Sequence, residues 1–134
     1  MKIKNNKGFA AIDATLAIIG IMIFSVLIFT LMHNNFMENL KVRMDTLATI
    51  YLTETLENVG ITAYADLTNE KLKKGEIELI PEDIQADKYN ITIDIIDVSK
   101  FEDEKIIKKV IATISYELGD RKYQYTMERI KIKE

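Results

Sequence analysis

The spacing of hydrophobic positions changes twice along the chain. From Phe9 to Met32 nearly every residue is apolar, and Asp13 is the only ionisable side chain in this run of 24 residues. At about 1.5 Å per residue, a helix of this length would span about 36 Å, which is enough to cross the hydrocarbon core of a membrane. The run therefore predicts a membrane-spanning helix.

Beyond Met32 the apolar residues become sparse but keep a helical spacing. They recur every three or four residues between charged ones, at Phe36, Leu40, Met44, Leu47 and Tyr51. This spacing is typical of an amphipathic helix with one face to bury. We therefore expect one helix from about Phe9 to Asn58, with Gly60 as its C-terminal stop. Burial of the face from Met44 to Leu56 beneath the chain's own strands is favoured over its use for binding a partner.

The C-terminal part alternates with the two-residue period of half-buried strands. Three such segments are present, at 89–95, 110–117 and 122–132. The sequence Leu118-Gly119-Asp120-Arg121 predicts a hairpin turn between the last two segments. After Met127 the apolar phase slips to Ile130 and Ile132, which predicts a bulge near Glu128.

Together these elements predict an α+β fold, in which a long N-terminal helix packs on a small antiparallel sheet of about three strands. A polar connector over residues 61–87, with Pro81 at a turn or break, joins the helix to the sheet.

Composition narrows the classes of function. Lys and Arg total 18 against 21 Asp and Glu, but three Lys precede Phe9, so a chain that begins there has 15 basic residues and a net charge of about −6. Because the basic residues are scattered, direct nucleic-acid binding is not expected. The absence of cysteine from the sequence excludes disulfides and thiolate metal sites.

The sequence contains no recognisable catalytic constellation and no Gly-rich phosphate loop. His33, the single histidine, lies beside the apolar run, and one imidazole is not a metal site. We predict no enzymatic activity, no metal and no cofactor. Acidic residues gather near the first predicted hairpin without the glycine-punctuated spacing of a calcium loop, so a solvated tip is favoured over calcium binding; they are Asp94, Asp97, Glu102, Asp103 and Glu104.

The flanks of the apolar run orient it. Lys2, Lys4 and Lys7 precede it, so the positive-inside rule places the N-terminus in the cytoplasm and the residues after Met32 outside. An ordinary secretory signal would end in small residues at a cleavage site, and residues 24–35 contain nothing of that kind. The distinctive boundary lies at the other end, where a basic segment closes in Gly8 and Phe9 follows.

The segment from Lys7 to Leu16 resembles the prepilin cleavage and methylation motif of type IV pilins and type II secretion pseudopilins. In that motif a short basic leader ends in Gly, an N-methylated Phe follows, and an acidic residue lies four positions later. The resemblance covers about the first 33 residues. It implies cleavage between Gly8 and Phe9, N-methylation of Phe9, and a role for Asp13 in subunit assembly.

Two departures from the motif refine the expectation. The family usually has Glu where this chain has Asp13, which is one methylene shorter. Many major pilins also have a helix-breaking proline where this chain has Thr30. We therefore expect an unbroken helix, and a minor pilin or pseudopilin rather than a major one.

The position of Asp13 also has a physical interpretation that does not depend on the family. A carboxylate inside the membrane costs roughly 2.5 to 3.5 kcal/mol, so it is expected to have a partner. Cleavage before Phe9 creates an amine, and Asp13 of one subunit could pair with the Phe9 amine of its neighbour and set the axial register. Alternatively, Asp13 simply reaches the cytoplasmic interface.

The resemblance divides the chain into a leader (1–8), a transmembrane or filament-core helix (9–33), an amphipathic continuation (34–59) and a small extracytoplasmic α+β head (60–134). The expected function is that of a structural subunit, which leaves the inner or cytoplasmic membrane for a type IV pilus or a type II secretion-like filament. Its expected partners are other pilin or pseudopilin subunits, prepilin peptidase, an assembly platform protein with its ATPase, and the membrane. The alternative is an uncleaved, single-pass anchor that carries an extracytoplasmic binding domain.

Overall fold

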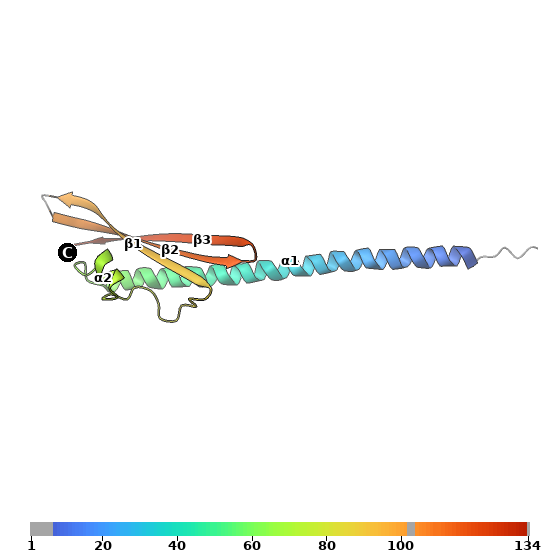
Figure 1. Ribbon diagram of the computed structural model, residues 1–134. Coiled ribbons are helices and arrows are strands. Elements are labelled where there is room, and N and C mark those ends of the chain that lie inside the picture. Colours follow the sequence, from blue (N-terminus) through green and yellow to red (C-terminus); the bar gives the residue numbers. More distant parts are fainter. Residues whose placement is uncertain (1–6, 102–103, 134) are drawn as a thin grey trace, which may run out of the picture. The chain divides into compact units, whose positions relative to one another are not determined.

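The computed structural model describes residues 7–101 and 104–133, and the side chains of residues 11–98 and 107–133. The order of elements confirms the α+β fold (Figure 1): α1 (Lys7–Ile61), α2 (Asn69–Lys73), β1 (Tyr89–Phe101), β2 (Glu104–Leu118) and β3 (Arg121–Ile132). The chain divides into two compact units, residues 1–40 and 41–134. Each unit is considered by itself.

In the first unit, α1 is apolar and exposed on every side. All side chains from residue 11 to residue 36 are exposed, and the helix is long and apolar enough to cross a membrane. Three hydroxyl groups in this stretch donate to the carbonyl four residues earlier: Thr15 to Ala11 at 2.8 Å, Ser25 to Ile21 at 2.8 Å and Thr30 to Val26 at 2.9 Å. Because these hydroxyls are satisfied within the helix, they can enter lipid without a partner. The helix continues through Thr30 without a break, as expected.

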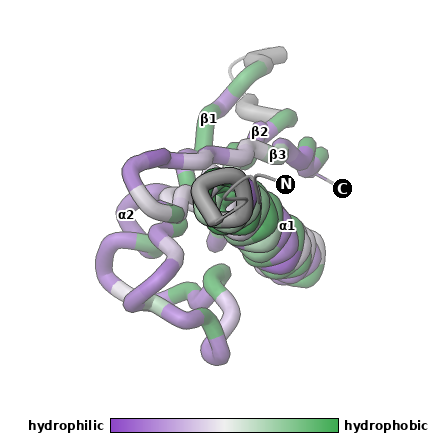
Figure 2. The backbone as a smooth tube through the Cα atoms, turned by 90° about the vertical axis from the view of Figure 1, so that its right-hand side faces the viewer, coloured by the Kyte–Doolittle hydropathy of each residue, from purple (hydrophilic) through white to green (hydrophobic). Residues whose placement is uncertain are grey.

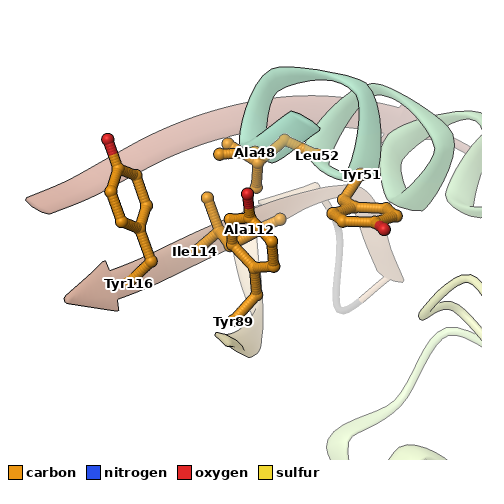
Figure 3. Close-up of a cluster of buried hydrophobic side chains, with 7 residues drawn as sticks. All are labelled: Ala48, Tyr51, Leu52, Tyr89, Ala112, Ile114 and Tyr116. Atoms are coloured by element: carbon orange, nitrogen blue, oxygen red, sulfur yellow. The ribbon is translucent and has the colours of Figure 1, made fainter. Parts of the chain in front are cut away.

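In the second unit, the three strands form an antiparallel sheet in the order β1-β2-β3, and residues 41–61 of α1 lie along one face of it (Figure 1). The buried cluster between helix and sheet confirms the expected burial of the amphipathic face. Ala48, Tyr51 and Leu52 of α1 pack against strand residues (Figure 3), namely Tyr89, Ala112, Ile114 and Tyr116. Met44, Leu47 and Leu56 are partly buried against the same cluster.

The connector between helix and sheet contributes to a second core. Leu67 and Leu79 are fully buried together with Val59 of α1 and Val110 of β2, and Ile95 completes the cluster. Burying a leucine contributes about 1.5 to 3 kcal/mol, so these two residues help to hold the connector against the helix and the sheet. The short helix α2, which the sequence pattern did not predict, begins after Thr68, whose side chain accepts from the backbone N–H of Lys71.

The bulge predicted near Glu128 is wrong. Pairing between β2 and β3 runs without interruption from Leu118 and Arg121 to Ile107 and Ile132. The alternation of faces therefore continues past Met127, and the next positions facing the helix are Arg129 and Lys131. Ile130 and Ile132 point to the outer face, where they are 59% and 57% exposed.

Two glycines have different roles. Gly119 has a φ of 61° in the turn between β2 and β3, which confirms the predicted hairpin. The helix does not stop at Gly60 but continues through it to Ile61. A Cβ atom on Gly60 would lie 2.7 Å from Nη2 of Arg129, so this glycine makes room for an arginine side chain that reaches over from β3.

Candidate functional site

The predicted assembly determinants lie at the start of α1. The backbone of Gly8 and Phe9 belongs to the helix, and their side chains lie outside the described residues. Asp13 follows one turn later and is exposed. Residues four apart share one face of a helix, so Asp13 lies on the same face as position 9 and about 6 Å further along the axis. Within the part of the chain that the structure describes, no hydrogen bond or ion pair engages the Asp13 carboxylate.

In the second unit, Asp45 of α1 binds three donors. Its Oδ2 accepts from Nζ of Lys41 at 2.6 Å, and its Oδ1 accepts from the hydroxyl of Tyr125 at 2.5 Å and from that of Tyr116. Nζ of Lys41 also lies 5.0 Å from the ring centre of Tyr123. This polar cluster ties the helix to two neighbouring strands.

The protonation states in this cluster follow from its hydrogen bonds. Burial raises the pKa of Asp45, but the hydrogen bonds from Lys41, Tyr116 and Tyr125 outweigh it, so the pKa lies below its usual value. Burial, followed by the hydrogen bond to Asp45, raises the pKa of Tyr116 well above that of a free phenol. The carboxylate thus stays ionised and the phenol stays neutral, which makes Asp45 a positioning group that fixes the sheet on the helix.

Cations occupy the opposite end of the face where the sheet meets the helix. The guanidinium of Arg129 donates to the carbonyl of Leu56 at 2.8 Å, and Nζ of Lys131 donates to that of Gly60 at 2.6 Å. The last four carbonyls of a helix have no partners within it and carry partial negative charge, so they favour cations. Gly60 carries one of these four, whereas the carbonyl of Leu56 lies further inside the helix. These contacts explain the change of phase in the apolar pattern of β3. Arg129 and Lys131 face the helix and are basic because they bind backbone carbonyls near the end of α1.

Lys108 of β2 also binds backbone carbonyls, and these belong to the connector between helix and sheet. Its side chain is buried, with 7% exposure. Its Nζ donates to the carbonyls of Tyr64 at 2.8 Å and Leu67 at 2.7 Å and lies 4.4 Å from the ring centre of Tyr64. Lys108 therefore holds the connector against the sheet.

The described residues of the second unit line cavities on both sides of the core. One of about 320 Å³ lies beside Met44 and Tyr116, and another of about 410 Å³ lies beside Gly60 and Lys131. Neither is lined by Asp13. Among residues 7–101 and 104–133, no group of three His, Cys, Asp or Glu side chains is placed to hold a metal ion.

The hydrophobic pattern of the sequence does not reveal the roles of Asp45, Lys108, Arg129 and Lys131. A signal for one of them was present, because extending the alternation of Val110, Ala112 and Ile114 back by two residues places Lys108 inside. A lysine at such a position needs acceptors, and the connector supplies them.

Comparison of the chain with protein-family models, with curated proteins and with solved structures gave no match.

Proposed function

We propose that this chain is a membrane-anchored subunit of an extracytoplasmic filament. More specifically, we infer a minor pilin or pseudopilin, which prepilin peptidase cuts between Gly8 and Phe9 and which then joins a type IV pilus or a type II secretion-like filament. The basic leader orients α1 with its N-terminus inside, and the head folds outside.

The observation that carries the proposal is an exposed acid within an exposed apolar helix. Among the residues that the structure describes, nothing covers the side chains around Asp13: Ile12 is 58% and Leu16 is 61% exposed. Lipid would cover the apolar side chains before assembly, and neighbouring helices would cover them afterwards. Neither environment solvates a carboxylate, which costs roughly 2.5 to 3.5 kcal/mol in lipid. The amine created at Phe9 of a neighbouring subunit is a partner of the right charge.

The first test is the N-terminal residue and the mass of the full-length protein, isolated from native membranes and from sheared filaments. We expect a chain that starts at Phe9 and carries an N-methyl group, and an intact Met1 chain in a strain without the peptidase. An intact Met1 chain in peptidase-competent cells would contradict the proposal and favour an uncleaved anchor for a binding domain.

The second test separates processing from assembly. Asp13→Asn keeps the size of the side chain and removes its charge, while Asp13→Glu restores the acid most common in the family that the motif resembles. We expect both variants to be cleaved, and only Asp13→Glu to enter filaments at the wild-type level. Normal incorporation of Asp13→Asn would refute the charge pairing and leave the cleavage pathway intact.

A further inference from the structure

The outer face of the sheet, which points away from α1, changes character along the strands. Nearer the turn between β2 and β3, two rows across all three strands have polar side chains without charge, hereafter the polar rows; they are Asn90, Ser115 and Gln124, and Thr92, Thr113 and Thr126. Towards the other end of the strands the same face has five isoleucines, hereafter the aliphatic patch; they are Ile96, Ile107, Ile111, Ile130 and Ile132.

Nothing in the described part of the chain covers the aliphatic patch. Ile96, Ile130 and Ile132 are 46%, 59% and 57% exposed. The connector and α2 lie on the helix side of the sheet in the views of Figure 1 and Figure 2, where Leu67 and Leu79 are buried. An apolar patch that stays exposed on a folded unit marks a site of interaction.

Contacts with α1 place the aliphatic patch at one end of the second unit. Tyr125 of β3 contacts Asp45 of α1. Further along β3, Lys131 contacts Gly60, so the strand runs along the helix in the same direction. At 1.5 Å per residue, these two helix positions are about 22 Å apart. The isoleucines beside Lys131 therefore lie far from Lys41, at which the chain enters this unit. This position favours a protein, rather than the membrane around the apolar run, as the cover of the patch.

Charged side chains also lie among the isoleucines. Lys109 and Glu128 pair with each other. Strand register places Asp94 beside Ile111, which in turn lies beside Glu128, and no hydrogen bond or ion pair engages Asp94 within the described residues. The uncompensated charge of the patch is therefore an acid. A partner that buries the isoleucines must bring a cation to this carboxylate, because a desolvated charge without a partner is costly.

The same charges oppose the pairing of two copies through this face. Copies anchored in one membrane have α1 pointing in one direction, so a two-fold axis between their sheets must run along the strands. Such an axis places β2 over β2 and β1 over β3 at the same level. Lys109 then lies opposite Lys109 of the second copy, and Asp94 lies opposite Glu128 of the second copy. Like charges that face each other across an interface are unfavourable, so the charges favour a different polypeptide.

We propose that the aliphatic patch binds one other subunit of the filament, through a surface that has branched aliphatic side chains and a basic residue opposite Asp94. The proposal rests on the filament function inferred above and names the chemistry of the partner. An apolar centre with charged groups around it is the usual anatomy of a protein interface. Because the partner is a different polypeptide, the contact joins two chains and does not propagate, which fits a subunit present in few copies.

Photo-cross-linking in intact cells of the native host tests the contact. The photoreactive residue p-benzoylphenylalanine replaces Ile130 in one full-length chain and Gln124 in another. Gln124 is the matched control, because it is exposed on the same face of the same strand but lies in the polar rows. We expect position 130 to form an adduct with a polypeptide that itself has a basic leader ending in Gly before an apolar run, as identified by mass spectrometry. Position 124 should yield little of this adduct.

Substitutions test the chemistry of the contact, with the probe kept at position 130. Asp94→Lys should lower the yield of the adduct about fivefold, which corresponds to about 1 kcal/mol, the upper range for an exposed ion pair. In a symmetric pair of copies the same change would raise the yield, because Asp94 would face Glu128. Ile96→Ser should lower the yield about tenfold through lost apolar contact. Thr92→Ser, its control in the polar rows of β1, should leave the yield unchanged.

The outcomes separate this proposal from the filament function. Equal adducts from both positions, or none, in chains that start at Phe9 and enter filaments would overturn the patch as the contact and leave the function standing. An adduct of two copies of this chain would overturn the choice of a different subunit. An adduct with lipid, or with a protein that lacks such a leader, would overturn the class of partner. A chain that keeps Met1 in peptidase-competent cells but still forms the expected adduct would overturn the filament function and leave the contact standing.

Discussion

Lys108 offers the sharpest test of how the head is held together. Lys108→Met keeps the length and apolar stem of the side chain but removes the ammonium group, so the carbonyls of Tyr64 and Leu67 lose their donor. A hydrogen bond to a charged group contributes about 1.5 to 3 kcal/mol. Because methionine does not have to desolvate an ammonium group, we expect the net loss for both bonds to be about 2 to 4 kcal/mol.

Lys109→Met is the matched control on the neighbouring residue. Lys109 points to the outer face of β2, where it pairs with Glu128, and the two side chains are 32% and 57% exposed. Exposed ion pairs contribute about 0 to 1 kcal/mol, so this variant should stay within about 1 kcal/mol of wild type. The two substitutions are chemically identical and differ only in the face of the sheet that they change.

The assay is equilibrium unfolding of the full-length protein in detergent micelles, followed by tyrosine emission and near-UV circular dichroism. All six tyrosines lie between residues 51 and 125, and the chain has no tryptophan, so both signals report residues 41–134 rather than the apolar run of α1. At about 4 °C per kcal/mol, Lys108→Met should melt about 8 to 16 °C lower. Equal stability of the two variants would refute the idea that Lys108 holds the connector.

Two further predictions concern the two ends of the interface between helix and sheet. Gly60→Ala should change the free energy of unfolding by less than about 0.5 kcal/mol, because the displacement of Arg129 offsets the gain of alanine in a helix. In an Arg129→Ala background the same change should stabilise the protein by about 0.5 to 1 kcal/mol. Denaturant unfolding of the four proteins measures both effects, and simple additivity would disprove the prediction. Because the pKa of Asp45 is lower in the folded state, its contribution is present above about pH 4 and is lost as the pH falls through the lowered pKa. Asp45→Asn should therefore be less stable than wild type at pH 7, and the difference should shrink as the pH falls below about 4. A difference that stays constant with pH would contradict the assignment.

Much of the fold could be predicted from periodicity alone. The change from a continuous apolar run to helical spacing and then to alternation places α1 and the three strands in the correct order. Leu118-Gly119-Asp120-Arg121 locates the hairpin because only a few residue types favour a positive φ. These features depend on neighbouring residues, so they can be predicted from the sequence alone.

What could not be predicted depends on contacts between distant residues. Arg129 and Lys131 interrupt the apolar alternation of β3. Their contacts with α1 cannot be read from the sequence, so a bulge was the natural interpretation. Gly60 has the sequence context of a helix stop. The structure instead requires glycine there because Arg129 approaches it from a strand about 70 residues later, and the local sequence does not show this contact. Leu67 and Leu79 lie in a segment with polar composition, and only the fold shows that they are buried.

The cations that bind the end of α1 have a consequence for the order of folding. The hydrogen bonds from Arg129 and Lys131 join residues separated by 73 and 71 positions. During synthesis the end of α1 is made well before β3, so the carbonyl of Gly60 relies on water until β3 is in place. Contacts of such long sequence separation form slowly. Residues 41–134 therefore reach their final structure only after nearly the whole chain has been made.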